Sequence, residues 1–224
     1  MEIQTTIQTR RHAETIAFIA LAIALGFLCF AMPLIIRTFN PQSFFAQNHQ
    51  FFVGPAVNTA LVLAAIKVRG HTKILSIVLL PSISSIVLGL WFAVGSQFML
   101  YMIPAIWLGN MALVLAFKLL YNRGIKNSEP KQLPKNSTLT AKIKYIELRF
   151  MIASIIGIGA KVGVIFGIYA ILRAFGVFPP PVASAMWTVM GVNQLITATI
   201  GCVIAYGVVK SIQLMKQDKP QINQ

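Results

Sequence analysis

Long apolar runs, separated by short polar or basic segments, dominate this chain of 224 residues. A helix needs about 20 apolar residues to cross a hydrocarbon core of roughly 30 Å. We therefore expect an all-α, polytopic membrane protein that forms a single membrane domain over residues 1–224. The runs predict six transmembrane helices, at about 15–36, 51–66, 74–94, 98–117, 150–172 and 183–209.

Polar and turn-forming segments separate these runs. A polar loop, Arg37 to Gln50, follows the first run, and Gly95-Ser96-Gln97 breaks the uncharged stretch that holds helices three and four. The stiff turn Pro179-Pro180-Pro181 precedes the sixth helix. Residues 122–148 are charged and rich in Ser, Pro and Lys, which predicts a solvated cytoplasmic linker.

The charges indicate how the chain is oriented. Only 11% of the residues are charged and 57% are apolar, whereas soluble domains carry about 25% charged residues. Of the 19 Lys and Arg residues, 16 fall on one side of the predicted membrane, and Arg37 and Arg173 fall on the other. Basic residues favour the cytoplasmic side. We therefore expect both termini in the cytoplasm, and we assign the net charge of +14 to topology and anionic lipid, with no nucleic-acid partner.

The predicted spans lack the residues that several function classes require. No Asp or Glu falls inside a span, which argues against a proton-coupled porter acting alone. Motifs for a metalloprotease or an aspartyl protease are missing as well. The three histidines lie in loops or near interfaces, and the two cysteines lie in apolar runs: His12, His49, His71, Cys29 and Cys202. We expect no enzyme activity, no catalytic residue, no cofactor and no metal site.

Lys161 is the one charge in the middle of a predicted span. A charge there costs about 3 kcal/mol on insertion scales, so the side chain should face an interior or a wet cavity. It lies about 200° around the helix from a stripe of small residues, Gly159, Gly163 and Gly167, that allows another helix to approach. Two interpretations stay open: an anchor for an anionic substrate group, or a lysine that bonds to neighbouring carbonyls or snorkels.

Amide and hydroxyl side chains gather in the other spans. Three asparagines follow glycines inside helices two, four and six: Asn58, Asn110 and Asn193. Each amide either binds a substrate or joins helices, for about 0.6–2 kcal/mol per bond. Asn193, Thr197 and Gly201 recur every four residues on one face, with Gln194 beside them, and this density favours a lined cavity.

The first helix carries two AxxxA spacings. Ala13 and Ala17 form one and Ala20 and Ala24 form the other. Small residues at this spacing make a smooth groove for another helix.

Three further segments stand out beside the alanines and the six-helix topology. They are GPAVNTALVLAA at Gly54 to Ala65, IPAIWLGNMALVLAF at Ile103 to Phe117 and VNQLITATIGCVIA at Val192 to Ala205. With them, most of residues 13–210 outside the linker resembles the substrate-binding (S) components of energy-coupling factor (ECF) transporters. The chain is similar to an uncharacterised S-like subgroup with a GP-x-VN second helix and a Q-x-x-TA-x-IG sixth helix.

The resemblance implies an S-component-like bundle in a bacterial plasma membrane. Such a protein captures a small, vitamin-like micronutrient and delivers it by docking on a transmembrane (T) component that two cytosolic ATPases drive. It implies that Ala13, Ala17, Ala20 and Ala24 face the coupling helices and that residues 37–50 gate the ligand. The implied ligand residues are Lys161, Asn193, Gln194 and Thr197, and the chemistry of Asn58 adds this residue to the candidates. Asn110, in the inner half of its span, is expected to be structural.

The candidate residues also bear on the class of substrate, and other functions stay open beside the importer. Lys161 favours a carboxylated or phosphorylated small molecule, and the lack of His and acidic clusters disfavours a nickel or cobalt ion. One alternative is a stand-alone facilitator or a sodium-coupled porter. Another is a membrane anchor or assembly factor for a redox enzyme, in which the polar residues only join helices. An integral membrane enzyme fits least.

Overall fold

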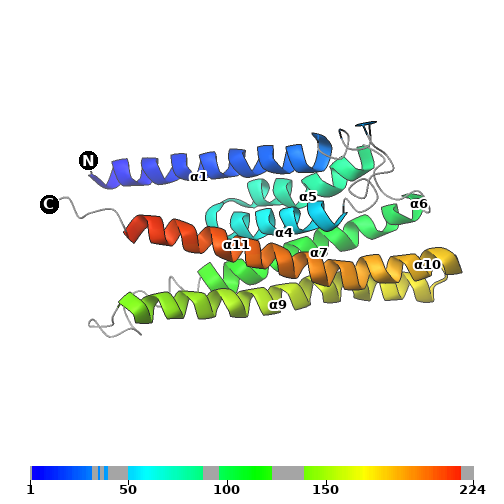
Figure 1. Ribbon diagram of the computed structural model, residues 1–224. Helices are drawn as coiled ribbons and strands as arrows, with labels where there is room; N and C mark the ends of the chain where they lie inside the picture. The colour runs from blue at the N-terminus through cyan, green and yellow to red at the C-terminus, as the bar shows by residue number, and fades with distance from the viewer. Residues whose placement is uncertain are drawn as a thin grey trace.

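The computed structural model describes residues 2–31, 35, 38–39, 50–87, 96–122 and 139–217, and it is helical almost throughout them. Figure 1 shows an elongated bundle in which the long helices run along a common direction. The all-α prediction is confirmed for these residues. The elements are α1 (Glu2–Gly26), η1 (Phe27–Ala31), α4 (Gln50–Lys67), α5 (His71–Val87), α6 (Ser96–Met99), η2 (Leu100–Met102), α7 (Ile103–Ala116), η3 (Phe117–Asn122), α9 (Leu139–Ala174), α10 (Pro180–Trp187), η4 (Thr188–Val192) and α11 (Asn193–Gln217).

Four helical stretches are long and apolar enough to cross a membrane. They are His12–Cys29, Leu100–Asn122, Tyr145–Ala174 and Pro180–Leu214. The apolar parts of α4 and α5, Phe51–Lys67 and His71–Ile83, are shorter and correspond to predicted helices two and three. The chain is thus a membrane-embedded helical protein with four candidate spans among the described residues.

The helix α9 begins earlier than the sequence predicts. Residues 139–148, expected in the linker, form its first turns. No Pro or Gly occurs between Pro134 and Gly157, so nothing in this segment opposes helix formation. At 36 residues α9 is about 54 Å long, which exceeds the hydrocarbon core. The rest of the linker, residues 123–138, and the predicted break at Gly95 lie outside the described residues.

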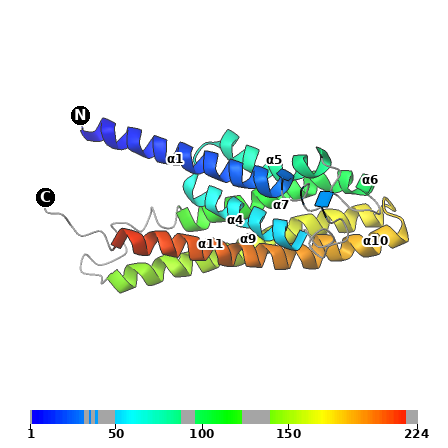
Figure 2. The same cartoon turned by 45° about the horizontal axis from the view of Figure 1, so that its top comes forward.

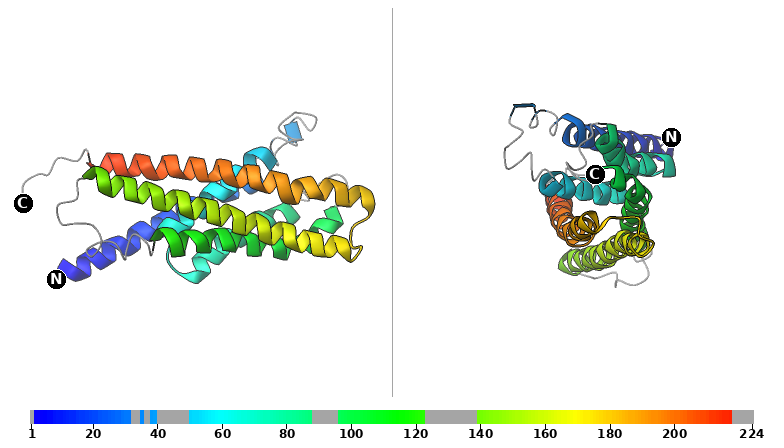
Figure 3. Two further views of the ribbon diagram at one scale, coloured as in Figure 1. Left: turned by 90° about the horizontal axis from the view of Figure 1, so that it is seen from below. Right: turned by 90° about the vertical axis from the view of Figure 1, so that its right-hand side faces the viewer.

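Two pairs of helices form the framework of the bundle. α7 packs against α9 in an antiparallel direction, and α4 packs against α11 in a parallel direction (Figures 1 and 2). α1 packs mainly on α4 and α5 and lies at the edge of the bundle, on the side away from α9 (Figure 3). The four framework helices therefore surround the centre, and α1 borders them.

Single glycines allow these close approaches. A Cβ on Gly109 would lie 2.6 Å from the Ile165 side chain, and one on Gly157 would lie 2.9 Å from Leu113. In contrast, a Cβ on the glycines of the predicted stripe, Gly159, Gly163 and Gly167, would meet nothing within 4 Å. Lys161 is buried and this stripe is open, as their opposite positions around the helix indicate.

The buried apolar side chains form two separate clusters. The larger one, here called the large core, draws on α1, α4, α5, α7, α9 and α11, with Leu25, Leu61, Ile77, Leu113 and Ala198 among its members. The smaller one, the small core, lies toward the end of the bundle that carries α6 and α10. It consists of Met99, Met102, Ala105, Ile165, Tyr169, Phe178, Ala183, Met186 and Met190.

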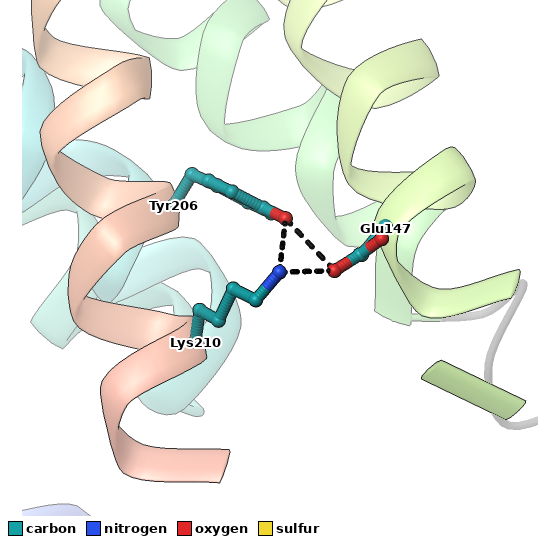
Figure 4. A network of polar contacts seen from close by, with 3 residues as sticks. All are labelled: Glu147, Tyr206 and Lys210. Atoms are coloured by element: carbon teal, nitrogen blue, oxygen red, sulfur yellow. Dashed lines mark hydrogen bonds and ion pairs between the residues drawn. The ribbon is translucent and has the colours of Figure 1, made fainter. Parts of the chain in front are cut away.

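A polar network joins α9 to α11 near the opposite end of the bundle (Figure 4). Lys210 Nζ lies 2.6 Å from Glu147 Oε1, and the Tyr206 hydroxyl donates to the same oxygen at 3.0 Å. The start of α1, the start of α9 and the end of α11 all lie at this end (Figure 1). Because the ion pair is partly exposed, solvent screens its attraction, and the pair fixes the register of α9 on α11 more than it stabilises the fold.

The packing of α4 on α11 is tested by adding one methyl group. A Cβ on Gly201 would lie 2.5 Å from Asn58 Cβ and 2.8 Å from the Pro55 carbonyl oxygen. We expect Gly201→Ala to lower the free energy of unfolding by about 1–3 kcal/mol, because backbone atoms must move. Gly207→Ala on the same helix is the control, since a Cβ there meets open space. Thermal unfolding in detergent measures both, and equal stability of the two variants contradicts this packing.

Candidate functional site

Buried polar side chains concentrate at one level of the bundle. Those in the described part of the chain are Asn58, Ser82, Asn110, Lys161 and Thr197. All but Ser82 come from the four framework helices, one from each. We call Asn58, Asn110, Lys161 and Thr197 the polar layer.

The polar layer lies between the two apolar cores on three of these helices. Along α9 the buried core residues before Lys161 belong to the large core and those after it to the small core. Along α7 the order of the buried core residues is reversed around Asn110, because α7 runs antiparallel to α9; the half-buried Val162 and Trp107 pack on the large core. The nearest core residues on either side are Ile158 and Ile165 on α9, Ala105 and Leu113 on α7, and Met190 and Ala198 around Thr197.

Lys161 is the centre of this layer. It is only 2% exposed, and its Nζ donates a hydrogen bond to Asn58 Oδ1 at 2.5 Å. An ammonium carries three donors, and no carboxylate within the described ranges lies at ion-pair distance. The structure therefore holds a buried lysine amine with no carboxylate partner among the described residues, and its charged form is costly there unless an anion joins it.

The amide of Asn58 is oriented by its own helix. Its Nδ2 donates to the Gly54 carbonyl oxygen at 2.9 Å, so the amide oxygen is the atom that faces Lys161. Gly201 on α11 leaves room for this side chain, and the Thr59 hydroxyl donates to the Gly201 carbonyl oxygen at 3.1 Å. Asn58 is thus fixed as an acceptor between α4, α9 and α11.

The predicted residues of the sixth helix differ in their environments. Thr197 is buried, but its hydroxyl donates to the Asn193 carbonyl oxygen at 2.7 Å. Its methyl group packs at Gly54, where an added Cβ would lie 2.8 Å away. Asn193 and Gln194 are half-buried on the preceding turn. The structure thus brings Lys161 and Asn58 together, places Thr197 in the same layer, and leaves Asn193 and Gln194 beside it.

Two polar atoms of α7 were not among the predicted site atoms. Asn110 Oδ1 and Trp107 Nε1 are buried and have no hydrogen-bond partner in the described part of the protein. The sequence places Asn110 in the inner half of its span, which suggested a structural role. The Gly109-Asn110 pair was the available signal in the sequence, and in the structure Gly109 lets the α7 backbone lie close to the Lys161 carbonyl oxygen.

The alanines of the first helix lie at the surface of the chain. Ala13, Ala20 and Ala24 are exposed and Ala17 is half-buried, so the stripe is not covered by the described residues. The loop expected to gate a ligand, residues 37–50, lies almost wholly outside the described part of the chain.

No family model matches this chain, and no curated protein or solved structure matches it either.

The Lys161–Asn58 bond predicts an asymmetry between two substitutions. Asn58→Leu leaves a buried ammonium without an acceptor and should lower the free energy of unfolding by about 1.5–3 kcal/mol. Lys161→Met removes the buried charge and should leave stability unchanged or raise it. The double variant should therefore be more stable than Asn58→Leu alone. Chemical or thermal unfolding in detergent measures all three, and a double variant no more stable than Asn58→Leu would contradict the contact.

Proposed function

We propose that this protein is the membrane-embedded substrate-binding component of an ECF-type importer, which captures a small, anionic, vitamin-like micronutrient in a bacterial plasma membrane. The observation that carries the proposal is Lys161, a buried lysine between two apolar cores whose described surroundings hold no carboxylate. An anionic ligand supplies the missing charge. It also accepts the ammonium hydrogens that Asn58 does not use.

The surroundings of Lys161 support a ligand-binding role in this proposal. Buried charges in proteins are normally paired, because an unpaired charge in an apolar medium is several kcal/mol less stable. Here the neighbouring acceptor is the neutral amide of Asn58, whose Nδ2 donates to the Gly54 carbonyl oxygen. Such a site keeps a positive potential for a substrate and does not neutralise it with a fixed carboxylate.

In this proposal the chain crosses the membrane six times and both termini are cytoplasmic. The four long candidate spans and the two shorter apolar helices, α4 and α5, together make up these six crossings. Support comes from the start of α1 and the end of α11, which lie at the same end of the bundle (Figure 1). Further support is the surplus of basic residues on the side that the sequence assigns to the cytoplasm.

The partner in this proposal is a T component that docks on α1 and is driven by two cytosolic ATPases. The exposed stripe of Ala13, Ala20 and Ala24 offers a smooth helix face at the edge of the bundle. Small residues at this spacing let two helix backbones approach closely within a membrane. The polar layer lies in the bundle interior, so docking on α1 leaves the ligand site free.

Mass spectrometry of small molecules that co-purify with the protein tests the binding function. We expect an anionic small molecule with the wild type and its loss from Lys161→Met, since the variant lacks the cation. Lys73→Met is the matched control, because Lys73 lies over the Phe18 ring and away from the polar layer. Recovery of the same anions from Lys161→Met at wild-type levels would refute Lys161 as the anchor.

The docking face is tested by a size change at one alanine. Ala20→Leu should leave the thermal stability and ligand content of the isolated protein unchanged, because Ala20 is exposed. It should abolish co-purification of the T component and ATPases from native membranes. Ala170→Leu, an exposed alanine of α9, is the control and should keep the complex. Failure of the wild type to co-purify any ATPase would instead favour a stand-alone carrier.

A further inference from the structure

The helix α1 is apolar on both of its long sides. Phe18, Leu21 and Leu25 pack on the large core. Ile16 and Ile23, about 200° around the helix from Phe18 and Leu21, are each 67% exposed. Acyl chains are as apolar as leucine side chains, so within a membrane no hydrophobic force favours one side of the helix over the other. Hydrophobicity alone therefore does not decide which side of α1 turns toward the bundle.

Glu14 provides a directed contact on the side that faces the bundle. It precedes Phe18 by one helical turn, so the two residues share a face of α1. A carboxylate oxygen of Glu14, Oε1, accepts a hydrogen bond from the backbone N–H of Arg69, in the turn between α4 and α5. Apolar packing tolerates several orientations of a helix, whereas this bond is compatible with one rotation of α1 about its axis.

The turn that binds Glu14 is itself held by side chains of η3. Lys118 Nζ donates to the Val68 carbonyl oxygen at 3.0 Å, and Asn122 Nδ2 donates to the Ala65 carbonyl oxygen at 2.8 Å. The Val68 carbonyl and the Arg69 N–H belong to the same peptide unit. This peptide unit is therefore bonded to η3 on its carbonyl side and to α1 on its N–H side.

The charges around this peptide favour the same rotation of α1. Glu14 is the one charged side chain between residues 13 and 36. Lys118 is near enough to Glu14 and Arg69 for both of their charges to act on it. Rotating α1 by half a turn would move the carboxylate away from these groups to the exposed apolar side that carries Ile16 and Ile23. A carboxylate among apolar groups in a membrane is costly, so the other rotation is disfavoured.

We propose that Glu14 is a positioning residue that fixes the rotation of α1 and thereby presents the alanine stripe to a partner helix. With Glu14 bonded to the α4–α5 turn, Ala13, Ala20 and Ala24 are exposed at the edge of the bundle. This inference rests on the proposed function, because the partner helix belongs to the T component. The position of α1 itself depends only on the contacts within this chain.

Two native thiols report separately on α1 and on the rest of the bundle. Cys29 lies in η1, which continues α1 and packs on α4 and α5, and it is only 3% exposed. Cys202 is only 4% exposed and lies on α11, within the large core. A rotation or detachment of α1 exposes Cys29, whereas Cys202 becomes exposed when the framework helices separate.

Thiol labelling of the full-length protein in lipid nanodiscs tests the role of Glu14. N-ethylmaleimide is the probe, and peptide mass spectrometry follows each cysteine. We expect Glu14→Leu to react at Cys29 about tenfold faster than the wild type, with an unchanged rate at Cys202, because α1 loses a hydrogen bond to a charged acceptor. Glu14→Gln keeps an oxygen that accepts from the Arg69 N–H and should react more slowly at Cys29 than Glu14→Leu.

A matched control removes another carboxylate of the same helix. Glu2 is the first residue of α1, and Glu2→Leu should keep both wild-type rates. Equal rates at Cys29 in the wild type and Glu14→Leu overturn the inference. Equal acceleration at Cys29 and Cys202 also overturns it, since Glu14 then supports the whole fold. So does a Glu14→Gln variant as reactive at Cys29 as Glu14→Leu.

Co-purification from native membranes tests the presentation of the alanine stripe. Glu14→Leu should lose the T component and the ATPases, while Glu2→Leu and Glu14→Gln should retain them. A Glu14→Leu variant that reacts faster at Cys29 and still retains the whole complex overturns the link between Glu14 and docking. If the wild type co-purifies no ATPase, the proposed function fails, and the labelling rates still decide whether Glu14 positions α1.

Discussion

The ammonium of Lys161 is the constraint on which the centre of this bundle depends. A cation at this depth costs about 3 kcal/mol on insertion scales, so the surrounding helices must offer it an acceptor. Asn58 does so from α4, and the long lysine side chain reaches its amide oxygen from α9. Gly54 and Gly201 let α4 lie close to α11, and Gly109 lets α7 lie close to α9, since an added Cβ at each would collide with the neighbouring helix. The helices that carry Asn58 and Lys161 are thus each packed closely against a framework partner.

The fold class and the approximate positions of the helices along the chain could be predicted from the sequence. Apolar runs gave the all-α class and the approximate positions of the helices, because hydropathy and length alone determine them. Lys161 stood out because it is a charge inside an apolar run, and Asn58 because its amide lies in another. The start of α9 was misplaced, since a charged segment is equally compatible with a linker and with a helix that extends beyond the membrane.

Helix pairing was harder to read, because it depends on which faces meet. The conspicuous stripe at Gly159, Gly163 and Gly167 faces open space, while the close contacts use isolated glycines opposite large side chains. The spacing of Asn193 and Thr197 correctly indicated one face, yet the Thr197 hydroxyl bonds to the carbonyl of Asn193. Asn110 was expected to be structural from its depth, and the structure shows that it is buried with its Oδ1 unpartnered among the described residues.

The division of the apolar interior has a consequence for how the protein opens. Cooperative units in proteins follow contiguous packing, and each unit has its own free energy of opening. The polar layer interrupts that packing, so the buried side chains of the small core around Tyr169 and Met190 form a cluster apart from the large core. Of the helices at this end, α6 contacts η2, and α10 contacts η4 and α9. If the end of the bundle that holds the small core opens, the polar layer becomes exposed from that side, while α4, which has no residue in the small core, keeps Asn58 in place.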